Sequence, residues 1–199
     1  MSAESKRHSI DPRERELSAR LCESEAQVLN ACSVRSIACT LFRPTLIYGA
    51  GTDRSLAPIA RFARRWRVLP IPVGAIGLRQ PIHATDIARS CAAVLNLPVT
   101  FGKIYPLGGG ERLRFDSMML RLRHTTPGFV LPVPVPLPLV RFATKYASFG
   151  SFSVAMIARL RLPLIADNTE AIRDFAFEPR KFRAEQVLPT HDPTISTEK

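Results

Sequence analysis

The sequence predicts an α/β fold with an incomplete sheet. Segments with helical apolar spacing alternate with short apolar runs of strand length, and this alternation is typical of α/β proteins. The best strand candidate, residues 34–42, is apolar almost without interruption, which indicates a strand covered on both faces, as in a parallel sheet. No other run is as apolar, so we expect only part of a parallel sheet.

The first predicted helix covers residues 12–33. Asp11 is a good N-cap residue, Pro12 suits the first helical position, and Glu14 completes an arrangement like a capping box. Apolar side chains recur at helical spacing along this helix and predict one apolar stripe. The stripe consists of Leu17, Leu21, Val28 and Cys32.

The middle of the chain continues the alternation. The expected helices cover residues 54–66, 85–96 and 116–124, and the expected strands cover residues 68–72, 79–83 and 103–107. Prolines within residues 68–72 forbid a helix there, and Thr85 or Asp86 is the expected cap of the second helix. We interpret the glycines of residues 108–110 as a turn that lets the chain reverse direction.

From Pro127 onward the composition changes. Prolines alternate with Val and Leu over residues 132–138, which blocks a regular central strand and favours an extended, polyproline-like stretch. Residues 139–161 are predicted to be helical, and the polar tail from residue 189 is expected to be frayed. The sequence thus divides into residues 1–126, 127–188 and 189–199.

Composition excludes several function classes. With 199 residues, of which 46% are apolar, the chain can bury a core and is not disordered. It contains no apolar run of the roughly 18 residues that a membrane-spanning helix needs, and its first residues lack the apolar core of a signal peptide. The four cysteines predict buried thiols of a reducing compartment, because no C-x-x-C pair suggests a disulfide framework or a zinc site.

The formal net charge of +11 raises the question of nucleic-acid binding. The arginines are scattered and no nucleic-acid-binding signature accompanies them, so we expect no specific nucleic-acid partner. Two interpretations of the densest group stay open: a solvated helix face, or a patch for an anionic ligand, a partner or a lipid headgroup. The group consists of Arg61, Arg64, Arg65 and Arg67, which surround Trp66.

Four segments, in order along the chain, resemble the signatures of one family. Residues 41–51 resemble an R-P-x-x-x-Y-G-x-G signature, and residues 79–88 resemble an R-x-P/F-x-H-V-x-D-x-A segment. Residues 105–111 and 177–182 resemble Y-N-L-G-G-G-E and G-W-x-P-R-x-F. The family is the extended short-chain dehydrogenases/reductases, which include NAD-dependent epimerases and dehydratases of nucleotide sugars. The resemblance covers only the C-terminal half of such a protein.

This resemblance implies the C-terminal part of a Rossmann-like NAD(P)-binding fold, with residues 127–188 as a small, mostly helical substrate or lid region. It also implies NAD or NADP as cofactor and an anionic, nucleotide-sugar-like substrate. The residues implied on the cofactor side are Arg43, Pro44, Thr45 and Tyr48. Those implied on the substrate side are Tyr48, Arg79 and His83, where an arginine suits a diphosphate because its fork binds phosphate bidentately.

Each of these side chains also has a purely structural interpretation. Pro44 can simply end a strand, Tyr48 can pack under its loop, and Arg79 can lie on the surface. His83 can form a local hydrogen bond while Asp86 caps a helix. Since these two residues lack a third ligand nearby, we expect no metal site.

Two parts of the family's machinery are missing from the sequence. The G-x-x-G-x-x-G turn that receives the cofactor's diphosphate would precede Pro44, where the chain has no glycine. The family's proton-transferring Tyr and Lys fall on Leu17 and Leu21, and leucine carries no proton. We therefore expect no catalytic residue, no epimerase or dehydrogenase activity from this chain alone, and poor cofactor binding.

A non-catalytic role is the competing interpretation. The resemblance allows this role, because family members without the Tyr/Lys pair can serve as scaffolds or accessory subunits. Residues 129–161 and the net charge of +11 would then face a partner protein or an anionic membrane. We expect a cytoplasmic location, with attachment to a membrane surface as the alternative, and an oligomer is a further open interpretation. The sequence also leaves open whether the chain is an atypical relative or a truncated product.

Overall fold

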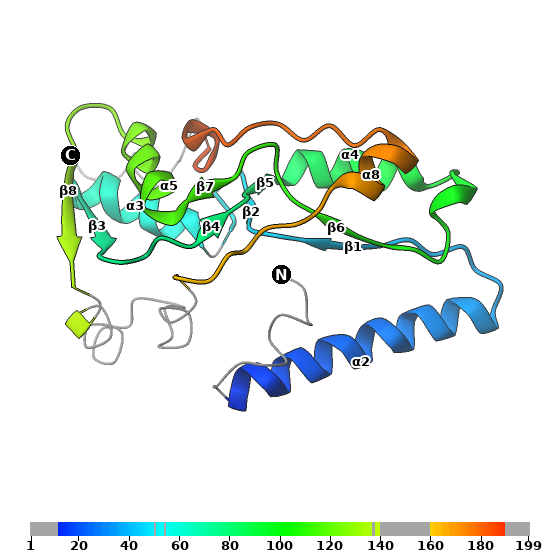
Figure 1. Ribbon diagram of the computed structural model, residues 1–199. Coiled ribbons are helices and arrows are strands. Elements are labelled where there is room, and N and C mark those ends of the chain that lie inside the picture. Colours follow the sequence, from blue (N-terminus) through cyan, green and yellow to red (C-terminus); the bar gives the residue numbers. More distant parts are fainter. Residues whose placement is uncertain (1–11, 50, 54, 137, 140–159, 190–199) are drawn as a thin grey trace, which may run out of the picture.

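Figure 1 shows a computed structural model that describes residues 12–49, 51–53, 55–136, 138–139 and 160–189. The α-helices are α2 (Pro12–Val34), α3 (Leu56–Trp66), α4 (Ala84–Val94), α5 (Phe115–Leu122) and α8 (Thr169–Phe175). The strands are β1 (Leu41–Pro44), β2 (Ile47–Tyr48), β3 (Val68–Pro72), β4 (Leu78–Arg79), β5 (Ile82–His83), β6 (Ile104–Leu107), β7 (Leu113–Arg114) and β8 (Leu131–Val135). Short 3-10 turns occur at η1 (Pro98–Thr100), η2 (Arg123–Thr125) and η3 (Ala184–Gln186).

The strands pair two by two instead of forming one broad sheet. Within the described residues, β1 pairs with β6, β2 with β5 and β3 with β8, all in parallel, while β4 pairs with β7 in antiparallel fashion. Helices and strands alternate along the body in Figure 1. The expected α/β class and the incomplete sheet are therefore confirmed.

The strand predicted over residues 34–42 is wrong in its extent. Strand β1 begins only at Leu41, because Ser36 adopts a left-handed conformation (φ 53°) that ends α2 and leaves residues 37–40 without regular structure. All four residues of β1 are half-buried, so the strand is not covered on both faces as its composition suggested. The segment predicted as one strand over residues 79–83 is instead divided between β4 and β5.

The proline-alternating segment also differs from expectation, because part of it forms strand β8. At the two ends of the β3–β8 pair, the Leu131 N–H donates to the Arg67 carbonyl and the Val73 N–H donates to the Val135 carbonyl, both at 2.9 Å. Along a strand, successive backbone N–H groups point alternately toward and away from a given partner strand. The backbone nitrogens of Pro132 and Pro134 in β8, and of Pro70 and Pro72 in β3, therefore point away from the other strand of this pair. A missing proline N–H therefore costs this ladder no hydrogen bond.

Glycines 108–110 serve close packing rather than chain reversal, which corrects the interpretation made from the sequence. None of the three adopts a positive φ. A Cβ on Gly109 would overlap the carbonyl oxygen of Pro81, and one on Gly110 would overlap that of Pro179. The Gln80 side chain fills the space beside Gly108. Three chain segments thus approach one another so closely that only glycine, which has no Cβ, fits at these positions.

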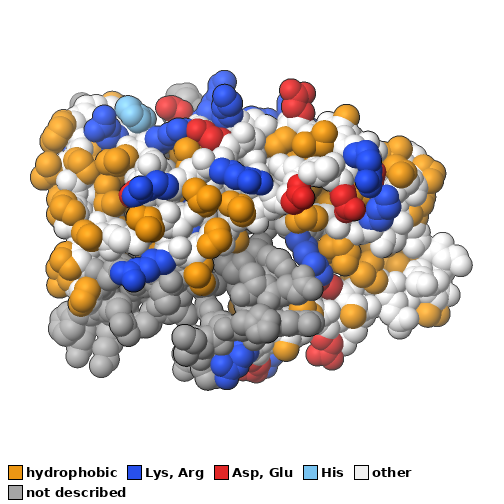
Figure 2. Space-filling model, in the orientation of Figure 1, with side chains coloured by type: hydrophobic (Ala, Val, Ile, Leu, Met, Phe, Trp, Pro, Cys, Tyr) orange, Lys and Arg blue, Asp and Glu red, His pale blue; other side chains and the backbone are white. Residues whose placement is uncertain are grey.

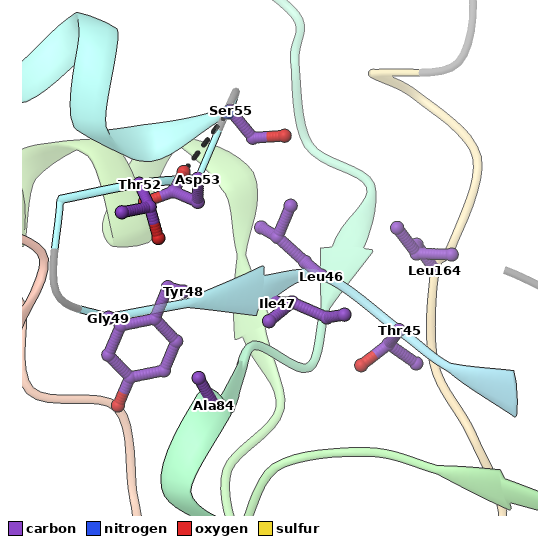
Figure 3. Close-up of a pocket in the computed structure, with 10 residues that line it drawn as sticks. All are labelled: Thr45, Leu46, Ile47, Tyr48, Gly49, Thr52, Asp53, Ser55, Ala84 and Leu164. Atoms are coloured by element: carbon purple, nitrogen blue, oxygen red, sulfur yellow. Dashed lines mark hydrogen bonds between the residues drawn. The ribbon is translucent and has the colours of Figure 1, made fainter. Parts of the chain in front are cut away.

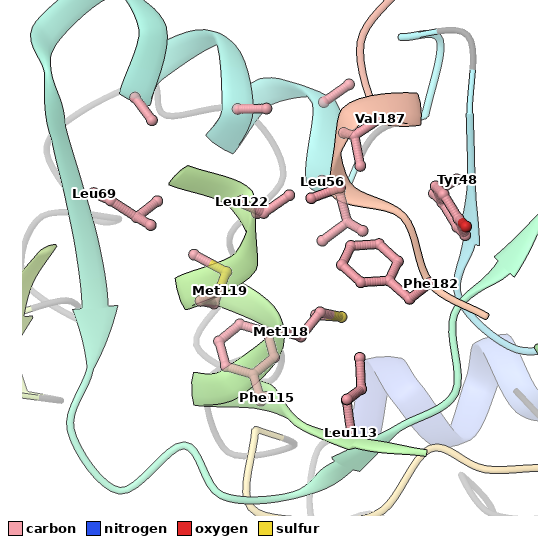
Figure 4. Packing of buried hydrophobic residues seen from close by; sticks show 14 of the residues in the cluster. Tyr48, Leu56, Leu69, Leu113, Phe115, Met118, Met119, Leu122, Phe182 and Val187 are labelled. Atoms are coloured by element: carbon pink, nitrogen blue, oxygen red, sulfur yellow. The ribbon is translucent and has the colours of Figure 1, made fainter. Parts of the chain in front are cut away.

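The main hydrophobic core combines residues that lie far apart in the chain. Figure 4 shows α5 and α3 packed together with the C-terminal segment that contains Phe182 and Val187. Leu56, Met118 and Leu122 are 0–1% exposed at the centre of this cluster. A smaller cluster joins β5 and β6 to α8 and consists of Ile82, Tyr105, Leu107, Ala171 and Phe177.

Helix α2 confirms the predicted helix, but its apolar stripe is not buried. Leu17, Leu21 and Val28 are 48%, 41% and 50% exposed. The helix lies apart from the body in Figure 1, and hydrogen bonds from Arg43 of β1 to Glu25 join the two. The expectation of buried cysteines is also wrong, because all four lie in the described part and are partly or fully exposed.

Some expectations fall outside the described residues. Asp11, most of the helix predicted over residues 139–161, and the tail from residue 190 belong to this group. Of the surface proposed over residues 129–161, only residues 129–136, 138–139 and 160–161 are described.

Candidate functional site

A pocket of about 470 Å³ lies where the chain leaves β1, passes through β2 and approaches α3. Ligands of open α/β proteins bind beyond the carboxyl ends of parallel strands, and this pocket occupies such a position. Figure 3 shows β2 running through the pocket, with Asp53 and Ser55 on one side and Leu164 on another. The lining residues are Thr45, Leu46, Ile47, Tyr48, Gly49, Thr52, Asp53, Ser55, Ala84 and Leu164.

Thr45 and Tyr48, both implied by the resemblance, line the pocket. The Thr45 hydroxyl donates to the Gln80 carbonyl, and the Thr45 N–H donates to the Leu107 carbonyl at 2.9 Å. Tyr48 is fully buried, and its hydroxyl accepts the Arg183 N–H at 3.2 Å. Both side chains therefore hold segments of the protein together at the wall of the pocket.

Tyr48 lies in an aromatic cluster that raises the pKa of its phenol. Its ring packs edge-on against His83, with 5.1 Å between ring centroids, and against Phe182, with 5.0 Å. Burial is the main cause of the raised pKa of Tyr48. A phenol that stays protonated and is hydrogen-bonded to the backbone is a packing group here.

Arg43 and Pro44 do not line the pocket. The Arg43 guanidinium forms an ion pair with Glu25 of α2, with 2.5 Å between Nη2 and Oε2 and 3.1 Å from Nε to each carboxylate oxygen. Pro44 ends β1 opposite Leu107. The structure thus directs Arg43 toward α2, and its implied place beside a nicotinamide stays a prediction.

Arg79 is buried, with 5% of its surface exposed, and it is not one of the residues that line the pocket. Its Nη1 donates to the carbonyls of Leu78 and Leu162 at 2.8 and 2.6 Å. The guanidinium also lies over the Phe115 ring, 5.5 Å from the centroid. These contacts stabilise the segment that begins at residue 160, so the structure places Arg79 in the protein interior rather than on the surface.

His83 caps α4, a role that the sequence assigned to Thr85 or Asp86. The His83 Nδ1 accepts the Thr85 N–H at 3.1 Å, which assigns the ring proton to Nε2 in the neutral imidazole. Burial, followed by the positive charge of Arg180, lowers the pKa of His83, while Asp86 opposes this effect. Asp86 is buried and accepts the Arg180 N–H at 3.1 Å and its Nε at 2.9 Å.

Asp53 is the pocket residue that sequence reasoning missed. Its Oδ1 accepts N–H groups at the start of α3, from Ser55, Leu56 and Ala57 at 3.0, 2.5 and 3.1 Å. Its Oδ2 is buried without a hydrogen-bond partner. The sequence did offer a signal for this role: Asp53 directly precedes the helix predicted over residues 54–66, and carboxylates are favoured at helix N-termini.

Three of the four clustered arginines have the following contacts within the chain. Arg61 donates to the Gly51 carbonyl, Arg67 donates to the Pro127 carbonyl, and Arg65 lies over Trp66 with 5.5 Å to the ring centroid. On the face visible in Figure 2, Lys and Arg side chains are dispersed among apolar and acidic groups. This arrangement favours a structural use of the arginines over a single anion-binding patch.

The described residues do not fit the diphosphate of a dinucleotide. A diphosphate needs open space at a glycine turn, so that backbone N–H groups can point at it. The space at Gly49 is filled by the His83 ring and that at Gly51 by Pro189. Residues 108–110 are equally filled by protein atoms. No chemistry of NAD or NADP is therefore assigned to these residues.

The positions implied for proton transfer lie on α2. Leu17 and Leu21 are half-exposed there, and the helix contains neither tyrosine nor lysine. Among the described residues, no three His, Cys, Asp or Glu side chains are grouped to hold a metal ion. In the same part of the chain, no helix combines the length and the apolar character needed to cross a membrane.

Comparisons with known proteins were made by family, by sequence and by structure. No family model matches the chain. Two curated relatives are each named NADH dehydrogenase [ubiquinone] 1 alpha subcomplex subunit 9, mitochondrial. The Dictyostelium discoideum protein is 26% identical over 109 residues, covering 54% of this chain and 30% of that protein. The Arabidopsis thaliana protein is 27% identical over 193 residues, covering 90% of this chain and 46% of that protein.

Solved structures of other proteins share the fold. RMD from Pseudomonas aeruginosa, complexed with NADPH, superposes with a TM-score of 0.61 at 11% identity, covering 85% of this chain and 52% of that one. UDP-glucose 4-epimerase from Thermotoga maritima, with UDP-glucose, gives a TM-score of 0.62 at 16% identity, covering 83% and 48%. The predicted likeness to epimerase/dehydratase-type proteins is confirmed at the level of the fold.

The fold is therefore Rossmann-like, of the epimerase/dehydratase type. The chain spans less than half the length of the curated relatives and about half of the matched structures. This length agrees with the expectation that the chain corresponds to half of such a protein. The identities are too low to transfer a substrate or a cofactor, and the expected cytoplasmic location stays a prediction.

Proposed function

We propose that this chain is a non-catalytic relative of the extended short-chain dehydrogenases/reductases and that it acts by binding a protein partner. One observation carries the proposal: Leu17 and Leu21 occupy the positions implied for the proton-transferring pair. Without a titratable group there, a hydroxyl substrate has no general base at these two positions. The filled glycine positions at residues 49, 51 and 108–110 support the same conclusion.

The exposed face of α2 supports a protein partner. Leu17, Leu21 and Val28 present apolar surface along a helix that lies apart from the body. Exposed apolar stripes of this kind favour association, because covering them removes apolar area from water. The names of the two curated relatives describe subunits of a larger enzyme, which agrees with such a role.

The first test measures cofactor binding and turnover. The purified chain is titrated with NADPH and NADH by fluorescence and is assayed for epimerase and dehydratase activity on nucleotide sugars. RMD from Pseudomonas aeruginosa, whose structure contains NADPH, serves as the positive control for binding. We expect no saturation at micromolar concentrations and no turnover. Micromolar affinity or measurable turnover would contradict the proposal.

The second test measures association through α2. In extracts of the native cell, the chain should elute well above its own 22.1 kDa. The double substitution Leu17→Glu/Leu21→Glu should return it to the monomer position, because two charges would enter the apolar contact. Arg20→Glu on the same helix, 75% exposed at its side chain, is the matched control and should leave the elution unchanged. A wild-type chain that elutes as a monomer would refute the partner.

A second candidate function is small-ligand binding in the pocket, which its volume of about 470 Å³ favours. The resemblance implies a nucleotide-sugar-like anion, whereas the charged residue in the lining is Asp53. UDP-glucose is the probe that tests this implied ligand class directly. Calorimetry should show saturable heat with the wild-type chain and none with Ile47→Trp, whose indole would fill the pocket. Ile172→Trp, at an exposed position of α8, is the control for a bulky substitution. Absence of heat with the wild-type chain would reject this candidate.

A further inference from the structure

One end of the molecule carries a group of exposed apolar side chains. It lies at the right of Figure 1, where α2 ends and β1 begins, beside the loop between α4 and β6. We call residues 33–41 and 95–103 the tip. Its exposed apolar side chains are Val34 (76% exposed), Ile37 (55%), Leu95 (72%), Val99 (47%) and Phe101 (37%).

Hydrogen bonds hold the two segments of the tip side by side. The Gly102 N–H donates to the Cys39 carbonyl at 2.7 Å. The Thr40 hydroxyl donates to the Thr100 carbonyl at 2.9 Å. Figure 2 shows hydrophobic side chains over much of this end of the molecule. The apolar side chains of the two segments therefore belong to one surface.

The turns that present these side chains use backbone N–H groups internally. The Ile37 N–H donates to the Cys32 carbonyl at 2.8 Å, and the Thr100 N–H donates to the Leu97 carbonyl at 3.0 Å. Two further bonds of this kind, both at 3.1 Å, run from Ser36 to Ser33 and from Phe101 to Pro98. Because these N–H groups need no water, the turns can enter a poorly hydrated environment at a low cost.

The charged residues of the tip are all basic. Its two segments contain Arg35 and Lys103 but no aspartate or glutamate. Arg35 is exposed. Lys103 pairs with Asp174 of α8 at 2.8 Å, but the Asp174 side chain is 3% exposed while that of Lys103 is 40% exposed. The tip therefore presents positive charge among apolar side chains, on a chain whose formal net charge is +11.

This combination favours one class of partner. A second copy of the chain does not fit, because two tips in contact would bring like charges together. An anionic membrane surface fits both features. Apolar side chains can enter the boundary between the headgroups and the acyl chains, while arginine and lysine attract acidic headgroups.

We propose that the tip binds the surface of an anionic lipid membrane. Val34 and Leu95, the most exposed of its apolar side chains, enter the headgroup region together with Phe101. Arg35 and Lys103 remain at the level of the acidic headgroups, where their charges are neutralised.

This surface is separate from the face of α2 proposed above to bind a protein partner. With a rise of 1.5 Å per residue, the helix places Leu21 about 20 Å from Val34. Each surface can therefore be altered without the other, and the membrane contact does not depend on the protein partner.

The first experiment measures co-sedimentation of the full chain with vesicles. Vesicles of phosphatidylcholine alone are compared with vesicles that also contain phosphatidylserine, at about 0.1 M and about 1 M salt. We expect binding to the phosphatidylserine vesicles only, weaker at the higher salt because screening reduces the attraction. Equal binding to both vesicle types would overturn the proposal. A chain that stays in the supernatant at the lower salt would also overturn it and would favour a protein contact at the tip.

Apolar variants locate the contact. Val34→Ser/Leu95→Ser should lower the apparent affinity for phosphatidylserine vesicles by about tenfold, because it removes apolar surface from the tip. Val73→Ser/Phe129→Ser is the matched control, at positions that are 53% and 77% exposed near β3 and β8, at the opposite end of the molecule in Figure 1. This control should bind as the wild-type chain does. Binding that the control loses and the tip variant retains would contradict the proposal.

Charge variants separate the tip from the net charge of the chain. Arg35→Glu should weaken vesicle binding by about tenfold, since a basic residue near the surface is attracted by acidic lipid. Arg20→Glu changes the net charge equally on the same helix, at a side chain that is 75% exposed. It should have little effect, because the attraction falls off within about 10 Å at 0.1 M salt. Equal losses for both variants would refute a contact at the tip.

A fluorescent reporter shows which part of the chain enters the lipid. Trp66 is the only tryptophan, so Trp66→Phe provides a background without tryptophan emission. In that background, Phe101→Trp should shift its emission to the blue on phosphatidylserine vesicles, whereas Phe129→Trp should not. Circular dichroism should confirm that every variant is folded. A shift seen only with Phe129→Trp would place the contact outside the tip and reject the proposal.

Discussion

At the scale of single residues, His83 shows how packing selects a protonation state. Its Nδ1 accepts a backbone N–H at the start of α4, a bond that only an imidazole unprotonated at Nδ1 can accept. Burial of the ring and the positive charge of Arg180 favour this neutral state, because both lower the pKa of His83. The edge-on contact with Tyr48 fixes the ring beside Gly49.

The first prediction concerns pH. Because the pKa of His83 is lower in the folded state than in the unfolded chain, the unfolded state binds more protons as the pH falls below about 6.5. The contribution of neutral His83 to the free energy of unfolding is therefore complete above that pH and is lost progressively below it. Urea unfolding at pH 7.5 and 5.5 should show a larger loss for the wild-type chain than for His83→Asn, which retains a capping side chain but does not titrate. Equal losses would contradict this assignment.

The second prediction concerns Gly109. Substitution by alanine would press a methyl group into the backbone of Pro81, which cannot move independently of β5. We expect the free energy of unfolding to fall by about 3 kcal/mol, at the upper end of overpacking costs. Gly102→Ala is the control: its Cβ would meet nothing within 4 Å, and only the positive φ of 75° would cost about 1 kcal/mol. Urea denaturation measures both.

At the scale of elements, hydrogen bonds between distant segments hold short strands and helices in place. The Gln80 side chain donates to the Gly109 carbonyl at 2.9 Å and accepts the Ala166 N–H at 2.9 Å. Asn168 exchanges two hydrogen bonds with the backbone of Gly108, at 2.8 and 2.9 Å. These amide side chains satisfy backbone groups that a two-residue strand cannot satisfy by pairing alone.

The third prediction concerns the link between α4 and the segment after α8. Asp86 is 3% exposed and pairs with Arg180 at 2.9 Å, so Asp86→Asn should leave a partly buried guanidinium without its counter-charge. We expect a loss of about 3 kcal/mol in the free energy of unfolding. Asp116→Asn, which breaks the exposed pair with Arg114, should cost at most about 1 kcal/mol. Similar losses for both variants would show that burial does not distinguish the pairs.

At the scale of the whole molecule, one core joins early and late parts of the chain. Phe182 and Val187 pack in the same cluster as Leu56 and Leu122. The body should therefore unfold as one cooperative unit, because removing the C-terminal segment would expose the faces of α3 and α5. Helix α2, with its half-exposed leucines, contributes little to that cluster.

The fourth prediction tests this cooperativity. Phe182→Ala should lower the free energy of unfolding by about 3–5 kcal/mol, since the ring is 4% exposed. Far-UV circular dichroism and the fluorescence of Trp66, at the end of α3, should report one shared midpoint. Ile172→Ala, 54% exposed, should change the stability by less than about 1 kcal/mol. Separate midpoints for the two signals would mean that the C-terminal segment unfolds independently.

Local sequence patterns predicted most elements but not how they pair. Apolar periodicity located α2, α3, α4 and α5 within a few residues, since helix formation depends on neighbours three and four positions apart. The extents of β1, β4 and β5 were missed, because a strand ends where its partner ends. The pairing of β8 was missed because the hydrogen-bonding side of each proline depends on its partner strand.

The candidate site was predictable in part. The resemblance pointed to the stretch that includes Thr45 and Tyr48, and both line the pocket. It did not reveal Asp53, or that Arg43 and Arg79 would be held by Glu25 and by backbone carbonyls. An arginine's environment is set by groups far away in the sequence, so a motif alone does not show where its charge points.

The amino-acid sequence by itself determined the alternation of helices and strands, the likeness to one family, and the leucines at the positions implied for proton transfer. Each of these depends only on residue identity and local spacing. The tertiary structure alone decided that the space beside glycines 49, 51 and 108–110 is filled by protein atoms and that Arg43 pairs with Glu25. Those outcomes require segments remote in the chain, or reversed by a turn, to come into contact, and no local pattern encodes the distance between them.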